Sequence, residues 1–221
     1  MPLERLFPRL FAIVALSVAF VAMTIAITAG MLATLDREVA ESMRSIWQES
    51  LQGLCQLIAE LGGLELTSIL MLALFIYLWR GGFGADALVV IAFAGAVGLE
   101  LIYKNLFSHP GPPRSLAHLD GPSLTELVPG TGLGNSFPSG HVLRAVIAYG
   151  LLAFVIRRLS PSRAVRLMAL PVAIVIIVAV AFDRLYLIVH WESDVIGGLL
   201  LGGLALVAAT VWLDRPGKAD N

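Results

Sequence analysis

Long apolar runs separated by short charged segments limit most strongly what this chain can fold into. The first run, Leu10–Leu35, contains no charged residue. A helix needs about 20 mostly apolar residues to cross a bilayer, and the apolar part of a cleaved signal peptide is usually only about 7–15 residues long. We therefore interpret this run as an uncleaved membrane span. The runs of this kind predict six spans: Leu10–Leu35, Gly62–Trp79, Asp86–Tyr103, His141–Ile156, Leu167–Phe182 and Asp194–Leu213.

The composition supports a membrane protein and excludes several other classes. Hydrophobic residues make up 58% of the chain and charged residues 14%, against about 45–50% and about 25% in soluble domains. The net charge of −1 provides no basic surface for nucleic acid. The single cysteine, Cys55, excludes a disulfide framework. We expect an all-α fold, with residues 1–221 forming one polytopic membrane helix bundle of six transmembrane helices.

The distribution of basic residues predicts the orientation in the membrane. Six spans put both termini on one side, and cytoplasmic segments carry an excess of Lys and Arg. The segments on the side of the termini hold Arg5, Arg9, Arg80, Arg157, Arg158, Arg163, Arg166, Arg215 and Lys218. The opposite segments hold fewer: Arg37, Arg44, Lys104, Arg114 and Arg184. We expect a multi-pass protein of the cell membrane with cytoplasmic termini and three connections facing the periplasm or exterior.

The three outward connections differ in character. Residues 36–61 space their apolar residues by three and four, which is typical of an outward interfacial helix or of a solvated helical cap packed on the bundle. Residues 105–138 form a long Pro- and Gly-rich loop, which is usually functional or disordered. Residues 183–193 are short and polar. On the last span, the pairs Gly197–Gly198 and Gly202–Gly203 indicate close helix packing.

The short connection carries the residues best suited to catalysis. Arg184, His190 and Asp194 stand in the order R-x5-H-x3-D. The four-residue separation lets Asp194 hold one ring nitrogen of His190 and leave the other free to attack. Arg184 reaches the same site only if the chain bends before the last span. The alternative is a surface histidine paired with a helix-start aspartate.

Two further segments place polar residues on the outward side. Pro138-Ser139-Gly140-His141 opens the fourth span, with Ser139 as N-cap and free N–H groups able to hold an anion. Lys104 ends the third span, where Glu100 could hold it from one turn away. Each segment also has a structural explanation when taken alone. His109 and His118 fit no motif, and we expect them to be solvated.

Together these segments resemble the type 2 phosphatidic acid phosphatase family, whose motifs are K-x6-R-P, P-S-G-H and S-R-x5-H-x3-D. The resemblance covers residues 62–213 as a phosphatase-like core. It implies that His190 is the nucleophile, that Asp194 orients it, and that His141 protonates the leaving oxygen and then activates water. It also implies that Lys104, Arg184 and the backbone at Ser139 and Gly140 hold phosphate, without metal or other cofactor.

Two positions depart from the family pattern. Gly111 stands where the first motif has its arginine, and Asp183 replaces the serine before Arg184. A missing arginine removes charge-assisted hydrogen bonds to phosphate. We expect Arg144, on the face of His141, or Arg114, in the loop, to replace it. The alternatives are a snorkelling Arg144 and a solvated Arg114.

These residues predict a membrane phosphatase that acts on a lipid phosphate or diphosphate at the outer leaflet. The substrates considered are polyprenyl diphosphate first, then phosphatidic acid and phosphatidylglycerol phosphate. The partners expected are this lipid and the bilayer, with no nucleic acid and no prediction of oligomeric state. Three alternatives stay open: a phosphotransferase using the same phosphohistidine, a lipid-phosphate binder with a decayed site, and a metal-dependent enzyme.

Overall fold

The structure is a computed structural model that describes residues 3–113, 115–118 and 135–214. Within those ranges the chain is helical apart from its connections, which confirms the all-α class. The helices are α1 Leu3–Thr28, α2 Ala33–Ser45, the 3-10 helix η1 Glu49–Leu51, α3 Gln52–Gly62, α4 Leu64–Arg80, α5 Gly84–Ala87, α6 Val90–Leu106, α8 Gly140–Leu159, α9 Arg163–Tyr186 and α10 Glu192–Leu213.

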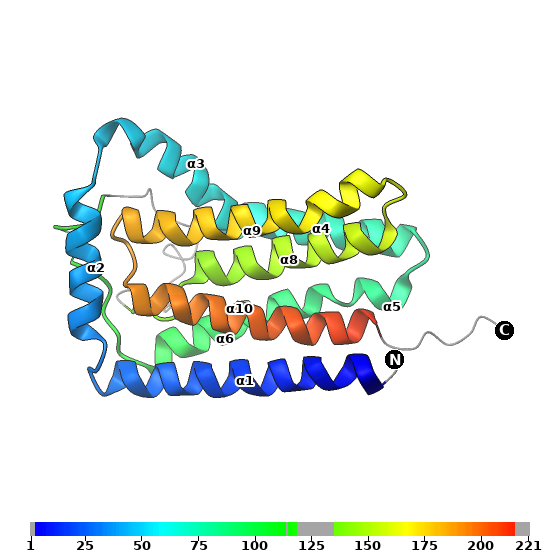
Figure 1. Ribbon diagram of the computed structural model, residues 1–221, viewed down its shortest axis with the longest axis horizontal. Coiled ribbons are helices and arrows are strands. Elements are labelled where there is room, and N and C mark those ends of the chain that lie inside the picture. The colour runs from blue at the N-terminus through cyan, green and yellow to red at the C-terminus, as the bar shows by residue number, and fades with distance from the viewer. Residues whose placement is uncertain (1–2, 114, 119–134, 215–221) are drawn as a thin grey trace.

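The long helices lie side by side along one axis (Figure 1). α1 begins and α10 ends at the same end of the bundle, while α2 crosses the opposite end. The starts of α8 and α10 and the ends of α6 and α9 all lie at the end that α2 covers. We call this end of the molecule the α2 end. It gathers the segments that carry the predicted site.

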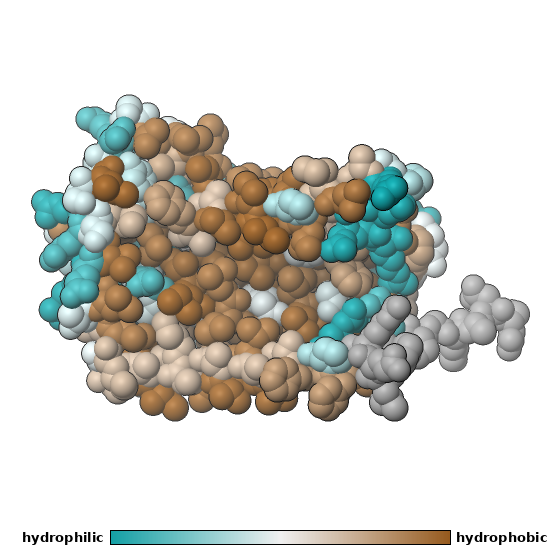
Figure 2. Space-filling model, viewed as in Figure 1, coloured by the Kyte–Doolittle hydropathy of each residue, from teal (hydrophilic) through white to brown (hydrophobic). Residues whose placement is uncertain are grey.

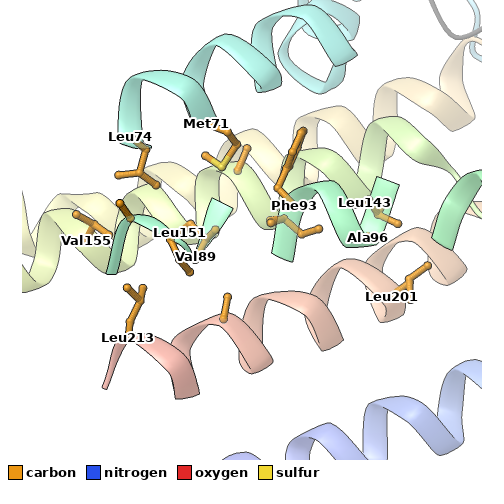
Figure 3. Close-up of a cluster of buried hydrophobic side chains, with 14 of the residues drawn as sticks. Met71, Leu74, Val89, Phe93, Ala96, Leu143, Leu151, Val155, Leu201 and Leu213 are labelled. Carbon is orange, nitrogen blue, oxygen red and sulfur yellow. The ribbon is translucent and has the colours of Figure 1, made fainter. Parts of the chain in front are cut away.

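The apolar core is centred on α8. Twelve of its 20 residues are buried, and it packs closely against α9 and α10. Figure 3 shows one part of this core, with side chains from α4, α6, α8 and α10 meeting between the helices; Met71, Phe93, Leu143, Leu151 and Leu201 are among them. A helix apolar on all faces belongs in the interior of a bundle.

The predicted close helix packing is confirmed at Gly198 and Gly202. A Cβ on Gly198 would lie 2.6 Å from the Ser139 carbonyl oxygen, and one on Gly202 would lie 2.9 Å from Cβ of Val146. Such distances leave no room for a side chain. The glycines therefore let α10 approach α8 directly, which sets the position of the start of α10 relative to the start of α8.

The outer surface suits a bilayer. Hydrophobic residues fill a wide band between two hydrophilic ends on the face shown in Figure 2. Among the described residues, four helical segments are long and apolar enough to cross a membrane: Leu6–Thr28, Gly84–Leu106, Arg163–Tyr186 and Glu192–Leu213. A fifth candidate is the pair Glu49–Gly62 and Leu64–Arg80, bent by 42° at Gly63. The chain is therefore a multi-pass membrane protein, and α8 is the buried helix at its centre.

Two expected boundaries are wrong. The first span ends at Thr28 instead of Leu35, because the chain turns at Gly30, whose φ of +71° suits glycine. The region 36–61 is also not one helix. It divides into α2 and α3 with a break near Trp47 and Gln48, where the Tyr186 hydroxyl accepts a hydrogen bond from the Gln48 N–H at 3.0 Å.

The bend between α3 and α4 has a structural use. The last carbonyl groups of a helix have no partner within it. Here the Leu61 oxygen accepts a hydrogen bond from the Tyr149 hydroxyl at 2.9 Å, and the Gly62 oxygen accepts one from Arg144 Nε at 3.1 Å. The end of α3 is thereby fastened to α8 beside His141, whose carbonyl oxygen would lie 2.8 Å from a Cβ on Gly62.

Candidate active site

His190 and Asp194 form the pair that the sequence predicts. His190 lies in the connection between α9 and α10, and its Nδ1 is 3.3 Å from Oδ2 of Asp194. The same carboxylate oxygen accepts the Trp191 N–H at 2.9 Å, so Asp194 also caps the start of α10. With Nδ1 turned toward Asp194, Nε2 is the ring nitrogen on the other side of the imidazole.

The surroundings of His190 favour its neutral form. Burial lowers the pKa of the His190 imidazole below its usual value, and the hydrogen bond and charge of Asp194 offset only part of this shift. The charges of Lys104 and Arg184 lower the pKa further. A neutral imidazole has the lone pair that a nucleophile requires. The surroundings of His190 therefore favour an imidazole that carries such a lone pair.

The chain bends between Arg184 and His190, as the sequence requires. α9 ends at Tyr186, and Ile188 has a φ of 52°, an uncommon value for a β-branched residue. The Arg184 guanidinium is buried and paired with Asp183. The unusual Asp183 therefore fixes this arginine in place.

The start of α8 supplies Ser139, Gly140 and His141. Ser139 stands at the N-cap, but its side chain makes no capping bond, and the Oγ atom is buried without a hydrogen-bond partner in the described part of the chain. Its N–H instead donates to the Asp194 carbonyl oxygen at 2.9 Å. This bond ties the start of α8 to the start of α10. The capping role predicted for the Ser139 side chain is wrong.

Glu100 joins two cations beside Gly140. Its Oε1 atom accepts a hydrogen bond from Lys104 Nζ at 2.9 Å, which confirms the expected pair, and its Oε2 accepts one from Arg144 NH1 at 2.9 Å. A Cβ on Gly140 would lie 1.9 Å from Glu100 Oε1. Gly140 is thus required for the Glu100 carboxylate to fit against the mouth of α8.

The structure brings most of the predicted site residues together. His141 interacts electrostatically with His190, Arg184, Arg144 and Lys104. These side chains come from α6, α8, α9 and the connection before α10, so the site is assembled only by the folded bundle. Arg144 lies beside it, but two of its nitrogens are engaged by Glu100 and Gly62. Arg114 lies outside the described residues, as do Arg215 and Lys218.

The expected solvated state is wrong for both loop histidines. His109 has a side chain only 18% exposed, with Nε2 3.4 Å from Oδ1 of Asp194. His118 stacks on Trp47 at a ring separation of 3.7 Å, and its Nε2 atom is buried. Burial lowers the pKa of His118, and the charge of Arg44 adds to the effect.

Gly111, the departure in the first motif, lies at the edge of the site. A Cβ there would be 3.3 Å from Cβ of Ser136 and 4.0 Å from the carbonyl oxygen of Val189, the residue before His190. The motif position that lacks its arginine therefore still lies beside the residue before His190, and a longer side chain would start close to it.

Sequence reasoning missed Asp36 and the full role of Glu100. The buried Asp36 carboxylate accepts hydrogen bonds from the N–H and the Oγ of Ser193, both at 2.9 Å. Burial raises the pKa of Asp36, and these two bonds oppose the shift. No sequence pattern indicated this contact across 157 positions. Glu100 did carry a signal, because it is an acidic residue inside an apolar run.

Comparison with known proteins identifies the class. Residues 83–218 match the PAP2 superfamily, and the chain therefore belongs to that superfamily. This is the family of membrane phosphatases that the three motifs resemble, and membership supports a lipid phosphate phosphatase with a hydrolase activity.

Particular relatives are similar over parts of the chain. It is 30% identical over 147 residues to "Putative undecaprenyl-diphosphatase YbjG" of Escherichia coli (strain K12), covering 66% of this chain and 67% of that protein. It is 41% identical over 68 residues to "Phosphatidylglycerophosphatase B" of Bacillus subtilis (strain 168), covering 30% of this chain. That match spans only 34% of the relative's length.

A solved structure has the same fold. The crystal structure of a transmembrane PAP2 type phosphatidylglycerolphosphate phosphatase from Bacillus subtilis superimposes with a TM-score of 0.82. The match covers 95% of this chain and 99% of that one, at 24% sequence identity. At this identity the likeness establishes the fold of the chain.

Proposed function

We propose that this protein removes phosphate from a lipid phosphate or diphosphate through a phosphohistidine formed at His190. The observation that carries the proposal is the His190–Asp194 pair, which lies within electrostatic range of His141, Arg184 and Lys104. Phosphoryl transfer requires mainly a positioned nucleophile and positive charge around the phosphoryl oxygens. The site supplies both.

The proposed reaction has two steps. His190 Nε2 attacks phosphorus, the bond to the leaving oxygen breaks, and His141 gives that oxygen a proton. A water then loses a proton to His141 and attacks the phosphohistidine, releasing phosphate and restoring His190. Asp194 holds Nδ1–H throughout and stabilises the positive charge on the phosphorylated ring.

The oxygens of the transferring group would be held by Lys104, Arg184 and the N–H groups at Ser139 and Gly140. Glu100 keeps Lys104 and Arg144 together at the mouth of α8. We propose Arg144 as the replacement for the cation missing at Gly111, in preference to Arg114. Because its Nε and NH1 are engaged, phosphate would bind its remaining nitrogen or would displace Glu100.

We further propose six transmembrane helices, with α8 as the central span and α3 as an interfacial segment. The proposed orientation has both termini in the cytoplasm and the α2 end outside. The ends of the helices support it, because Arg80, Arg157, Arg158, Arg163 and Arg166 cluster opposite the α2 end. The substrate headgroup would then lie at the outer leaflet.

The named relatives supply two substrate candidates, an undecaprenyl diphosphate and a phosphatidylglycerol phosphate. We place polyprenyl diphosphate first and phosphatidylglycerol phosphate and phosphatidic acid after it. The decisive experiment offers the three lipids separately to purified protein in detergent, with and without chelator, beside His190→Ala.

Phosphate release that resists chelator and is lost in His190→Ala would support the proposal and name the substrate. Release lost with chelator would favour a metal-dependent enzyme. Transfer of phosphate to another lipid without free phosphate would favour the phosphotransferase. Binding without turnover would favour a decayed site.

A further inference from the structure

His109 lies in the long loop 105–138, and residues at both ends of that loop hold it over the active site. Its N–H donates to Oδ1 of Asn135 at 2.9 Å, and its carbonyl oxygen accepts the Ser136 N–H at 2.8 Å. Pro110 forms an antiparallel bridge with Asn135. Asn135 in turn donates to the Lys104 carbonyl oxygen at 2.8 Å. The backbone position of His109 is therefore fixed from both ends of the loop.

The His109 imidazole faces the second oxygen of Asp194. Its Nε2 lies 3.4 Å from Asp194 Oδ1 and 3.5 Å from Ser193 Oγ. Asp194 is fully buried, and Oδ1 makes no hydrogen bond within the described residues. Leaving a buried carboxylate oxygen without a donor costs free energy. The Nε2–H tautomer of His109 would supply that donor after a shift of a few tenths of an ångström.

A second buried carboxylate, that of Asp36, lies close to Asp194 and His109. Asp36 of α2 binds Ser193 and interacts electrostatically with both Asp194 and His109. Two like charges near each other disfavour the ionised forms of both carboxylates, so a hydrogen-bond donor close to them is favourable. His109 lies 3.4 Å from Asp194 Oδ1 and interacts with Asp36, while His190 holds the other oxygen of Asp194. The carboxylate that orients the nucleophile is thus flanked by two imidazoles.

We propose that His109 is a positioning residue for the phosphatase reaction, acting through Asp194; this rests on the proposed function of His190. By holding Oδ1, His109 stops the Asp194 carboxylate from rotating away from His190 Nδ1. The alignment matters most when the His190 ring becomes positively charged in the phosphohistidine. His109 should therefore act on turnover more than on substrate binding.

The test compares His109→Ala and His109→Gln with wild type, using the lipid that wild type hydrolyses. Gln can place an N–H near the position of Nε2 but cannot titrate. His118→Gln is the matched control, because His118 lies in the same loop and contacts Trp47 instead of the site. Removing the hydrogen-bond partner that orients a metal-binding side chain typically lowers affinity or activity by about 10–100-fold.

We expect His109→Ala to lower kcat by about 10–100-fold with KM changed less than about threefold, by analogy with such partners. His109→Gln should recover most of the kcat, and His118→Gln should match wild type. A His109→Ala variant with wild-type kcat would overturn the inference, as would a Gln variant no better than Ala. If wild type itself shows no release dependent on His190, the proposed function fails instead.

Discussion

Both ends of the bundle carry charged residues, but they are held in different ways. At the α2 end, Glu100, Arg144, Asp183, Arg184 and Asp194 are each at most 1% exposed. At the opposite end, the Arg9–Asp214 pair has side chains 24% and 29% exposed, and the Arg158–Asp86 pair 40% and 14%. Exposed pairs contribute little to stability, whereas a buried charge is costly unless it is paired.

The difference indicates what each end is for. A chain that needed only to anchor its helices at the membrane surface could leave its charges in water, as the end opposite α2 does. Burying five charged groups together has no benefit for packing alone. The α2 end therefore holds a site whose charges are arranged in advance, and the predictions below test that contrast.

The largest effect is expected at the proposed nucleophile, His190, and its partner, Asp194. His190→Ala should lower phosphate release at least about a thousandfold, as removal of a catalytic nucleophile usually does. Asp194→Asn should cost on the order of a hundredfold or more, because the amide can hold the wrong tautomer of His190. Initial rates of phosphate release measure both. An Asp194→Asn variant with wild-type activity would refute the orienting role.

A large effect is also expected where Glu100 meets Gly140. Gly140→Ala should reduce activity strongly, because the new Cβ would overlap Glu100 Oε1. Glu100→Ala removes that overlap. The fold loss of activity in the double variant should therefore be smaller than the product of the fold losses in the two single variants. A double-mutant cycle on phosphate release measures the coupling. Strictly multiplicative losses would mean that the contact has no effect.

The pH profile gives an intermediate effect. Because burial lowers the pKa of His190, its neutral imidazole persists to lower pH than that of an ordinary histidine. Activity should be retained on acidification through the usual histidine range and then fall about tenfold per pH unit once His190 protonates. The acid limb of kcat/KM for wild type reports this. A fall centred above the usual histidine range would contradict it.

A smaller effect, and a gain, is expected at Gly111. Gly111→Arg restores the arginine of the first motif beside Val189 and should raise kcat/KM by several-fold, since charge-assisted hydrogen bonds to phosphate are the stronger ones. Gly111→Ala adds the same Cβ atom without the charge and serves as the control. A loss of activity in both variants would show that contact with Ser136 governs this position instead.

The smallest effect is expected at the end opposite α2. Arg158→Ala breaks the exposed pair with Asp86 and should change phosphate release by less than about twofold and stability by at most about 1 kcal/mol. Thermal unfolding in detergent and initial rates measure the two. A loss comparable to that of the α2-end variants would remove the contrast between the ends.

Local spacing predicted much of this molecule. The apolar runs indicated most of the helices, and the separation of four residues predicted the contacts of His190 with Asp194 and of Glu100 with Lys104. These contacts lie within one turn or one connection. The small residues of α10 predicted close helix packing for the same reason, because helix geometry determines which residues share a face; the structure shows that the partner is α8.

The contacts that could not be predicted join distant segments. His109 reaches Asp194 only because the loop arms pair with each other, and Asp36 reaches Ser193 only because α2 folds across the bundle end. Neither contact leaves a periodic pattern in the sequence. The turn at Gly30 and the break after Ser45 were likewise hidden within long runs of helix-compatible residues.

The most direct test of the account is to look for the phosphoenzyme itself. Wild-type protein would be mixed with lipid labelled in its terminal phosphate and quenched rapidly under alkaline conditions that preserve phosphohistidine. We predict label bound to protein, assigned to His190 by peptide mass spectrometry and absent in His190→Ala. Release of phosphate without any labelled protein, together with turnover by His190→Ala, would contradict a phosphohistidine at His190.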